Sequence, residues 1–169
     1  MKKFSSIILF LLFFVPVTNA QGSQSSLENI TKQIPQMGSI KCKFRQEKYL
    51  PSISKPLISS GNFEFVQNKG VYFHTLYPVQ STVDYTNKNY KPINDIINAI
   101  STKRYEKLEK EFSFYFAGNS SKWSLEMKPK EKSNAYNYIS SIKIEGADYI
   151  HKINIQQKNG NRTVLCFTK

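Results

Sequence analysis

The chain has 169 residues, 40% of them hydrophobic, and a formal net charge of +12. This length suits one domain with a hydrophobic core, and the sequence shows no internal repeat, low-complexity tract or sign of a second domain. The basic balance favours an anionic membrane surface, an acidic ligand or an acidic partner protein, or else a solvated face that keeps the protein soluble.

The N-terminal residues have the three parts of a secretory signal peptide. Residues 1–3 are basic, residues 4–17 are apolar, and small residues end at Ala20. The apolar run is short for a membrane span of about 20 residues. We therefore expect residues 1–20 to be cleaved and residues 21–169 to form one exported domain. An exported chain rarely meets nucleic acid, so we expect no nucleic-acid partner.

A short helix and a strand follow the predicted cleavage point. Ser25 and Glu28 form a capping-box pattern, and apolar residues at helical spacing run to Ile34, where Pro35 ends the helix. After Gly38, apolar and charged residues alternate, which predicts a strand with one apolar face. That face carries Ile40, Cys42, Phe44 and Gln46.

Residues 55–78 carry the pattern of a β-hairpin. Its turn is Asn68-Lys69-Gly70, and Pro78 ends the ladder because it has no N–H to donate. Large apolar residues alternate on one face of each strand, which marks a sheet with one apolar face. These residues are Phe63, Phe65, Val71 and Phe73.

A second helix is predicted from about Pro92 to Glu109. Pro92 suits a first helical residue, and an apolar stripe follows at helical spacing. Such a stripe is most often a face packed permanently on the core, but it could also be a lid over an apolar surface. The stripe consists of Ile93, Ile96, Ile97 and Ile100, and Tyr105 and Leu108 could extend it.

From Phe112 onwards the alternation typical of strands returns, and Asn159-Gly160 is the strongest hairpin signal in the chain. The whole pattern predicts a mainly β fold, an antiparallel sheet of roughly eight to ten strands with short helices. Its inner face is rich in aromatic residues. The pattern alone favours ordinary core over a surface that encloses an apolar ligand.

Catalytic and metal-binding signals are weak. There is no Gly-x-Ser-x-Gly and no Cys-x-x-Cys, and the two histidines, His74 and His151, lie in different predicted strands. Glu64 and Glu145 are most simply solvated strand residues. We expect no enzymatic activity, no cofactor and no metal site.

Cys42 lies in the first predicted strand and Cys166 in the last. In an oxidising compartment they could form a disulfide that ties these strands together, or both could be free thiols. The sequence leaves both alternatives open, because a bridge requires Cα atoms within about 7 Å of each other.

Several short motifs, in matching order, resemble the outer-membrane lipoprotein carrier (LolA) family across nearly all of the exported domain. They are Phe44-Arg45-Gln46, the hairpin from Gly61 to Pro78, the Ile-rich helix, Trp123-x-Leu125-x-Met127-x-Pro129 and Ile150-His151-Lys152-Ile153. The resemblance implies an unclosed β-barrel in the periplasm of a Gram-negative bacterium. It would hold the acyl chains of a lipoprotein or other lipid under a helical lid. It would pass them, as a monomer, from an inner-membrane donor protein to an outer-membrane acceptor.

The resemblance also assigns residues. The lipid-binding inner face would comprise Phe44, Phe63, Phe65, Val71, Phe73, Phe114, Trp123 and Leu125, and the lid Ile93, Ile96, Ile97 and Ile100. Where carriers have an arginine that latches the lid, this chain has Gln67, a weaker donor, which suggests a divergent paralogue. The alternative is a non-enzymatic periplasmic interaction or sensor module of the same fold that binds a membrane protein or an anionic glycolipid.

Overall fold

The computed structural model describes residues 24–67, 69–84 and 91–169. Three parts of the chain lie outside the described residues: residues 1–23 with the predicted signal peptide, Asn68 of the first hairpin turn, and residues 85–90, which precede Lys91. What the sequence predicts for them stays a prediction.

The helices are α1 (Leu27–Gln33), α2 (Lys91–Thr102), α3 (Glu106–Glu111) and the 3-10 helix η2 (Asn134–Asn137). The strands are β1 (Ile40–Tyr49), β2 (Leu57–Val66), β3 (Gly70–Tyr77), β4 (Ser81–Asp84), β5 (Phe112–Asn119), β6 (Lys122–Pro129), β7 (Ile139–Gly146), β8 (Ile150–Gln157) and β9 (Arg162–Thr168).

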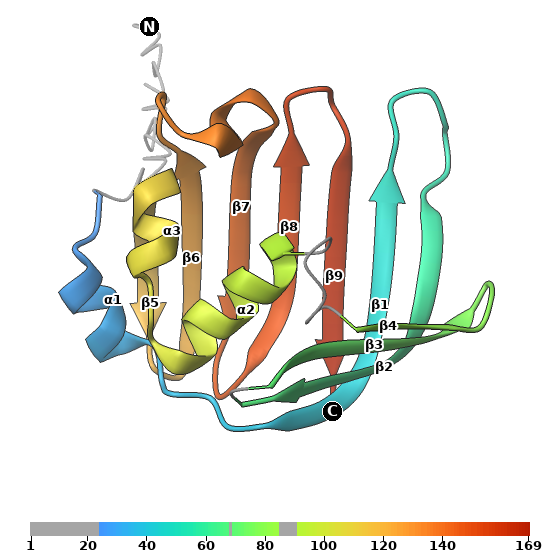
Figure 1. Cartoon of the computed structure of the whole chain (residues 1–169), viewed down its shortest axis with the longest axis horizontal. Helices are drawn as coiled ribbons and strands as arrows, with labels where there is room; N and C mark the ends of the chain where they lie inside the picture. Colours follow the sequence, from blue (N-terminus) through green and yellow to red (C-terminus); the bar gives the residue numbers. More distant parts are fainter. Residues whose placement is uncertain (1–23, 68, 85–90) are drawn as a thin grey trace, which may run out of the picture.

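All of these strands belong to one antiparallel sheet in the order β4-β3-β2-β1-β9-β8-β7-β6-β5. The sheet is open, with β4 at one edge and β5 at the other. It curves strongly, because β5 to β9 run side by side whereas β2, β3 and β4 turn across them at the other end (Figure 1). Helices α2 and α3 lie over β5 to β8, with α1 beside them (Figure 1). The predicted fold class, an unclosed antiparallel half-barrel with short helices on one face, is confirmed.

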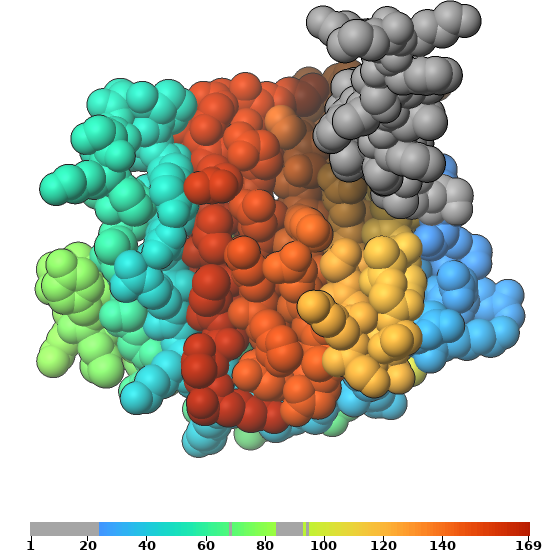
Figure 2. Space-filling view, turned by 180° about the vertical axis from the view of Figure 1, so that it is seen from behind, coloured from blue at the N-terminus to red at the C-terminus, as the bar shows by residue number. Residues whose placement is uncertain are grey.

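The two faces of the sheet differ in chemistry. Along β1 the buried Phe44 alternates with the exposed Lys43 and Arg45, as a strand with one apolar face requires. The outer face, which the strands themselves form (Figure 2), carries exposed ion pairs such as Lys41–Glu64 at 3.1 Å. Such pairs contribute little to stability, so burial of the inner face dominates.

Gly61 allows the sheet to bend at the end near β4. The β2–β3 register shifts between Ser60 and Gly61. A Cβ atom on Gly61 would collide with the carbonyl oxygen of His74 and lie 2.9 Å from the backbone nitrogen of Leu76. Both obstacles are backbone atoms of the neighbouring strand, so only glycine fits this close approach.

The predicted second helix is wrong in one respect, because it is two helices. Lys103 ends α2 with a left-handed φ of 59°, and the Arg104 N–H donates to the Ala99 carbonyl at 2.9 Å. This is the hydrogen bond of a Schellman cap. The sequence offered no glycine or proline at this position, so its pattern could not reveal the break.

The predicted capping residue of the first helix is also wrong, by one position. Ser26, not Ser25, is the N-cap of α1 and accepts from the Asn29 N–H at 3.3 Å. Ser25 instead lies against the edge strand β5, where its N–H donates to the Phe114 carbonyl at 2.8 Å. The N-terminal segment therefore covers part of an edge that would otherwise be open to another strand.

Candidate lipid-binding site

Four phenylalanines pack together where the sheet bends, and we call this group the aromatic corner. The ring centroids of Phe63 and Phe167 lie 4.6 Å apart, those of Phe44 and Phe73 4.9 Å apart, and those of Phe63 and Phe73 5.0 Å apart. The rings come from β1, β2, β3 and β9, which neighbour one another in the sheet. Each favourable ring pair adds about 0.5–1.5 kcal/mol beyond burial, so the corner is held by both its rings and its ladders.

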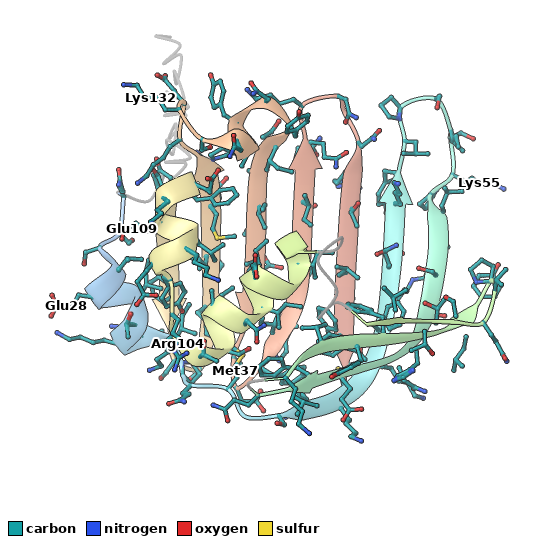
Figure 3. All side chains as sticks on the ribbon, viewed as in Figure 1. Glu28, Met37, Lys55, Arg104, Glu109 and Lys132 are labelled. Carbon is teal, nitrogen blue, oxygen red and sulfur yellow. The ribbon has the colours of Figure 1, made fainter. Side chains whose placement is uncertain are left out.

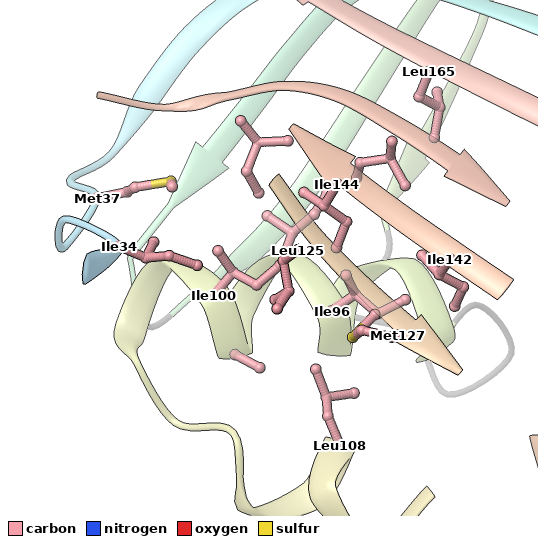
Figure 4. Packing of buried hydrophobic residues seen from close by; sticks show 14 of the residues in the cluster. Ile34, Met37, Ile96, Ile100, Leu108, Leu125, Met127, Ile142, Ile144 and Leu165 are labelled. Atoms are coloured by element: carbon pink, nitrogen blue, oxygen red, sulfur yellow. The ribbon is translucent and has the colours of Figure 1, made fainter. Parts of the chain in front are cut away.

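A second group of inner-face residues is aliphatic and lies beneath α2, and we call it the aliphatic floor. Its side chains project from β6, β7 and β9 toward Ile96 and Ile100 of α2 (Figure 4). They are all almost fully buried, and the set comprises Leu125, Met127, Ile142, Ile144 and Leu165.

Helix α2 covers this floor with its isoleucine stripe. Ile96, Ile97 and Ile100 are buried, and Ile93 is half-buried. Hydrogen bonds join the helix to the rest of the chain near its C-terminal end. The Met37 N–H donates to the Ser101 carbonyl at 3.2 Å, and the Lys103 Nζ donates to the Thr31 carbonyl at 2.8 Å. Met37 lies beside that end (Figure 3). In this structure the stripe packs on the core, and whether α2 stays there or opens as a lid stays a prediction.

A small cavity lies between the aromatic corner and α2. Its volume is about 20 Å³, space for a single water-sized molecule. Apolar side chains dominate its wall, which is formed by Met37, Ile40, Cys42, Phe63, Phe65, Ile97, Ser101, Tyr149, Ile150 and Phe167. Among the described residues, the protein's own side chains occupy the inner face around this cavity, and an acyl chain needs more room than the cavity provides.

The predicted lipid-binding residues are all buried on the inner face, but they fall into different places. Phe44, Phe63 and Phe73 belong to the aromatic corner and Leu125 to the floor. The others are Phe65 on the cavity wall, Val71 on β3, Phe114 against Tyr105, and Trp123, whose Nε1 donates to the Ala147 carbonyl at 2.9 Å. Whether these residues contact lipid stays a prediction.

Sequence reasoning missed Phe167 and Met37, and it gave Tyr105 no role beyond extending the helical stripe. Phe167 alternates with Leu165 on the last strand, so its pattern could have placed it on the inner face. Met37 lies in a connection without periodicity, and nothing in the sequence marked it.

Gln67 directly follows β2 and joins the hairpin to the segment before β1. Its backbone N–H donates to the Ser39 Oγ at 3.1 Å. The latch role that the resemblance gives its side chain stays a prediction.

The disulfide that the sequence left open does not form, because Cys42 and Cys166 are free thiols. Cys166 pairs with Arg45 across the β1–β9 ladder. Arg45 lies three residues after Cys42 along β1. An odd number of steps places the two side chains on opposite faces of the sheet. Burial raises the pKa of the Cys42 thiol, so this cysteine is a weak nucleophile.

Among the described residues, no group of three or more His, Cys, Asp or Glu side chains could hold a metal ion. No helix in this part of the chain has the length and apolar character needed to cross a bilayer.

The fold and site define a class, an open antiparallel half-barrel whose apolar inner face is covered by short helices. No family model matches the chain, and no curated protein matches it. Among solved structures, it is similar to a LolA superfamily protein from Nitrosomonas europaea, with 9% sequence identity and a TM-score of 0.40. The match covers 85% of this chain and 90% of that one. At this level of similarity, the function must be argued from this chain's own residues.

Proposed function

We propose that this protein binds the acyl chains of a lipoprotein or another lipid between α2 and the aliphatic floor. It would carry them through the periplasm from the inner toward the outer membrane. The observation that supports this proposal is the way in which α2 covers the aliphatic floor. The amphipathic helix α2 covers the floor's buried side chains, with Leu108 of α3 beside it (Figure 4), and the hydrogen bonds of Ser101 with Met37 and of Lys103 with Thr31 lie at the C-terminal end of α2.

The free energy lost when α2 leaves the floor is close to the free energy gained when an acyl chain takes its place. Exposing the three buried isoleucines of α2 costs about 5–9 kcal/mol at the usual value for each side chain. Each methylene that takes their place returns about 0.8 kcal/mol. A chain of roughly six to eleven methylenes therefore offsets the opening of α2, and a longer chain binds with a net gain.

Such a balance suits a carrier, because cargo that is bound by a small surplus can be released to a partner with a more apolar site. The chain's net charge of +12 falls to +10 when Lys2 and Lys3 leave with the predicted signal peptide, and this basic charge would favour encounters with anionic membrane surfaces at the donor and acceptor sites. No covalent step is required.

A chain-length series tests the proposal. The protein, purified without detergent, is loaded with the apolar fluorophore N-phenyl-1-naphthylamine, which is then displaced by lysophosphatidylcholines with 6 to 18 carbons. We expect no displacement by the shortest chains and a steep rise in affinity beyond roughly ten carbons. A protein that takes up neither the fluorophore nor the longest lipid would contradict the carrier function and favour the interaction module.

A further inference from the structure

Tyr105 carries a polar group that its surroundings leave unsatisfied. It lies directly before α3, its side chain is 2% exposed, and its hydroxyl has no hydrogen-bond partner among the described residues. A buried donor without a partner is destabilising, whereas phenylalanine would fill the same space without that loss. The hydroxyl therefore needs an explanation other than packing.

The position of Tyr105 connects it with the proposed ligand site. Its ring lies edge-on to Phe114, with 6.1 Å between the ring centroids. Both residues belong to the same buried cluster as Ile96, Ile100 and Leu125. Tyr105 also follows the left-handed Lys103 that separates α2 from α3. A movement of α2 that hinged at Lys103 would therefore begin two residues from Tyr105.

Two further buried side-chain atoms without a hydrogen-bond partner occur in the part of the chain that the structure describes, and they lie elsewhere. Ser133 Oγ is in the connection between β6 and β7, and Asn154 Oδ1 belongs to β8, at a position that alternates with the buried Ile153. Of these three atoms, the Tyr105 hydroxyl is the one carried by a residue of the buried cluster that contains Ile96 and Ile100 of α2.

We propose that Tyr105 is the polar contact of the ligand site, and that its Oη–H donates a hydrogen bond to the carbonyl oxygen of an ester- or amide-linked acyl chain. This inference rests on the proposed function and narrows its substrate class. A lipid that brings such a carbonyl under α2 must desolvate it, and the orphaned hydroxyl supplies the donor that water supplied before. Burial also raises the pKa of Tyr105, which keeps the hydroxyl neutral and able to donate.

The apolar surroundings favour a carbonyl over a charged group. Leu108, Phe112 and Phe114 are buried around this part of the cluster. A phosphate or carboxylate would lose its hydration there without a counter-ion. The charged part of the lipid would remain at the surface, where Arg104 and Lys107 are exposed.

A matched pair of lipids isolates this hydrogen bond. Palmitoyl lysophosphatidylcholine has an ester carbonyl, and its hexadecyl ether analogue differs only in lacking that carbonyl oxygen. Binding of both, below their micelle concentrations, is measured on the wild-type chain, on Tyr105→Phe and on Tyr115→Phe. Tyr115 lies on the outer face of β5, where Lys128 Nζ sits 4.9 Å from the centroid of its ring, so it serves as the matched control.

We expect the wild-type chain and Tyr115→Phe to bind the ester about fivefold more tightly than the ether, and Tyr105→Phe to bind both equally. Without ligand, Tyr105→Phe should unfold at a temperature equal to or higher than the wild type, which shows that lost ester binding is not lost folding. An ester-to-ether ratio that Tyr105→Phe leaves unchanged would overturn the assignment while leaving the proposed function standing. Binding of neither lipid by the wild type would overturn both.

Discussion

The aromatic corner and the aliphatic floor are both fully buried, yet they are closed in different ways. Phe44, Phe63, Phe73 and Phe167 project from strands that are paired in the ladder, so opening the corner requires breaking backbone pairs along β1, β2, β3 and β9. The floor is closed by α2, a helix of 12 residues whose backbone hydrogen bonds are largely its own. Equal burial therefore does not mean equal resistance to opening.

This difference indicates where a ligand enters. The cavity of about 20 Å³ lies between the aromatic corner and α2, and its wall includes Phe63 and Phe167 of the corner and Ile97 of the helix. We infer that α2 moves and the aromatic corner stays. The changes below test that division, from the largest expected effect to the smallest.

Gly61→Ala should have the largest effect, because the added Cβ meets the backbone of β3 and removes the bend that forms the corner. We expect a loss of about 4 kcal/mol or more in the free energy of unfolding, measured by urea denaturation. Gly38→Ala is the matched control, because no atom lies within 4 Å of its added Cβ. Equal stability of the two variants would show that the bend does not depend on Gly61.

Phe63→Ala removes the ring that contacts both Phe73 and Phe167. We expect a loss of about 3–5 kcal/mol in the free energy of unfolding and no gain in lipid affinity, because the corner is not the part that opens. A variant that binds N-phenyl-1-naphthylamine more tightly than the wild type would place the entrance at the corner instead.

Ile97→Ala weakens the packing of α2, which covers the floor, and leaves the aromatic corner intact. We expect a smaller loss of about 2 kcal/mol in unfolding free energy, because the site is on a helix and borders an existing cavity. Because the closed state is destabilised and the lipid-bound state is not, affinity for a 16-carbon lipid should rise about tenfold in the displacement assay. Lower affinity, in step with the lower stability, would contradict the role of α2 as a movable cover.

The smallest expected effect concerns the chemical reactivity of the two cysteine thiols. Without reductant, the unfolded chain should show two free thiols by colorimetric titration, since Cys42 and Cys166 lie on opposite faces. In the folded chain, the raised pKa of Cys42 means that less of it is thiolate at any given pH. Its alkylation should therefore be slower than that of free cysteine at pH 8 and should accelerate as the pH rises. A titration that finds no free thiol would contradict the register of β1 and β9.

Strand identity and the inner face could be predicted from the sequence because alternation is a local property. Phe63, Phe65, Val71 and Phe73 all face inward as their spacing required. The isoleucine stripe of α2 likewise follows from helical periodicity alone. These predictions needed no knowledge of how distant segments meet.

The predictions that failed or stayed open depend on how distant segments meet, or on backbone conformations that no sequence pattern marks. Whether Cys42 and Cys166 lie on the same face of the sheet depends on the register of β1 against β9, which no local pattern contains, and in the structure they lie on opposite faces. A lysine at a left-handed helix end carries no turn signal, so the break at Lys103 was hidden. Tyr105 looked like a continuation of the helical stripe, and its unpartnered hydroxyl becomes visible only once the core around it is assembled.

Quenching of Trp123 by a brominated acyl chain tests the location of the ligand most directly. Trp123 is the single tryptophan of the chain, and it projects from β6 on the same face as Leu125 and Met127 of the floor. A lysophosphatidylcholine with bromine in its acyl chain should quench this fluorescence in a saturable way, whereas the unbrominated lipid should not. The control is the double variant Trp123→Phe with Tyr115→Trp, which moves the fluorophore to the outer face. Quenching of Trp123 alone would support an acyl chain under α2, and quenching of the outer-face tryptophan alone, or of both equally, would contradict it.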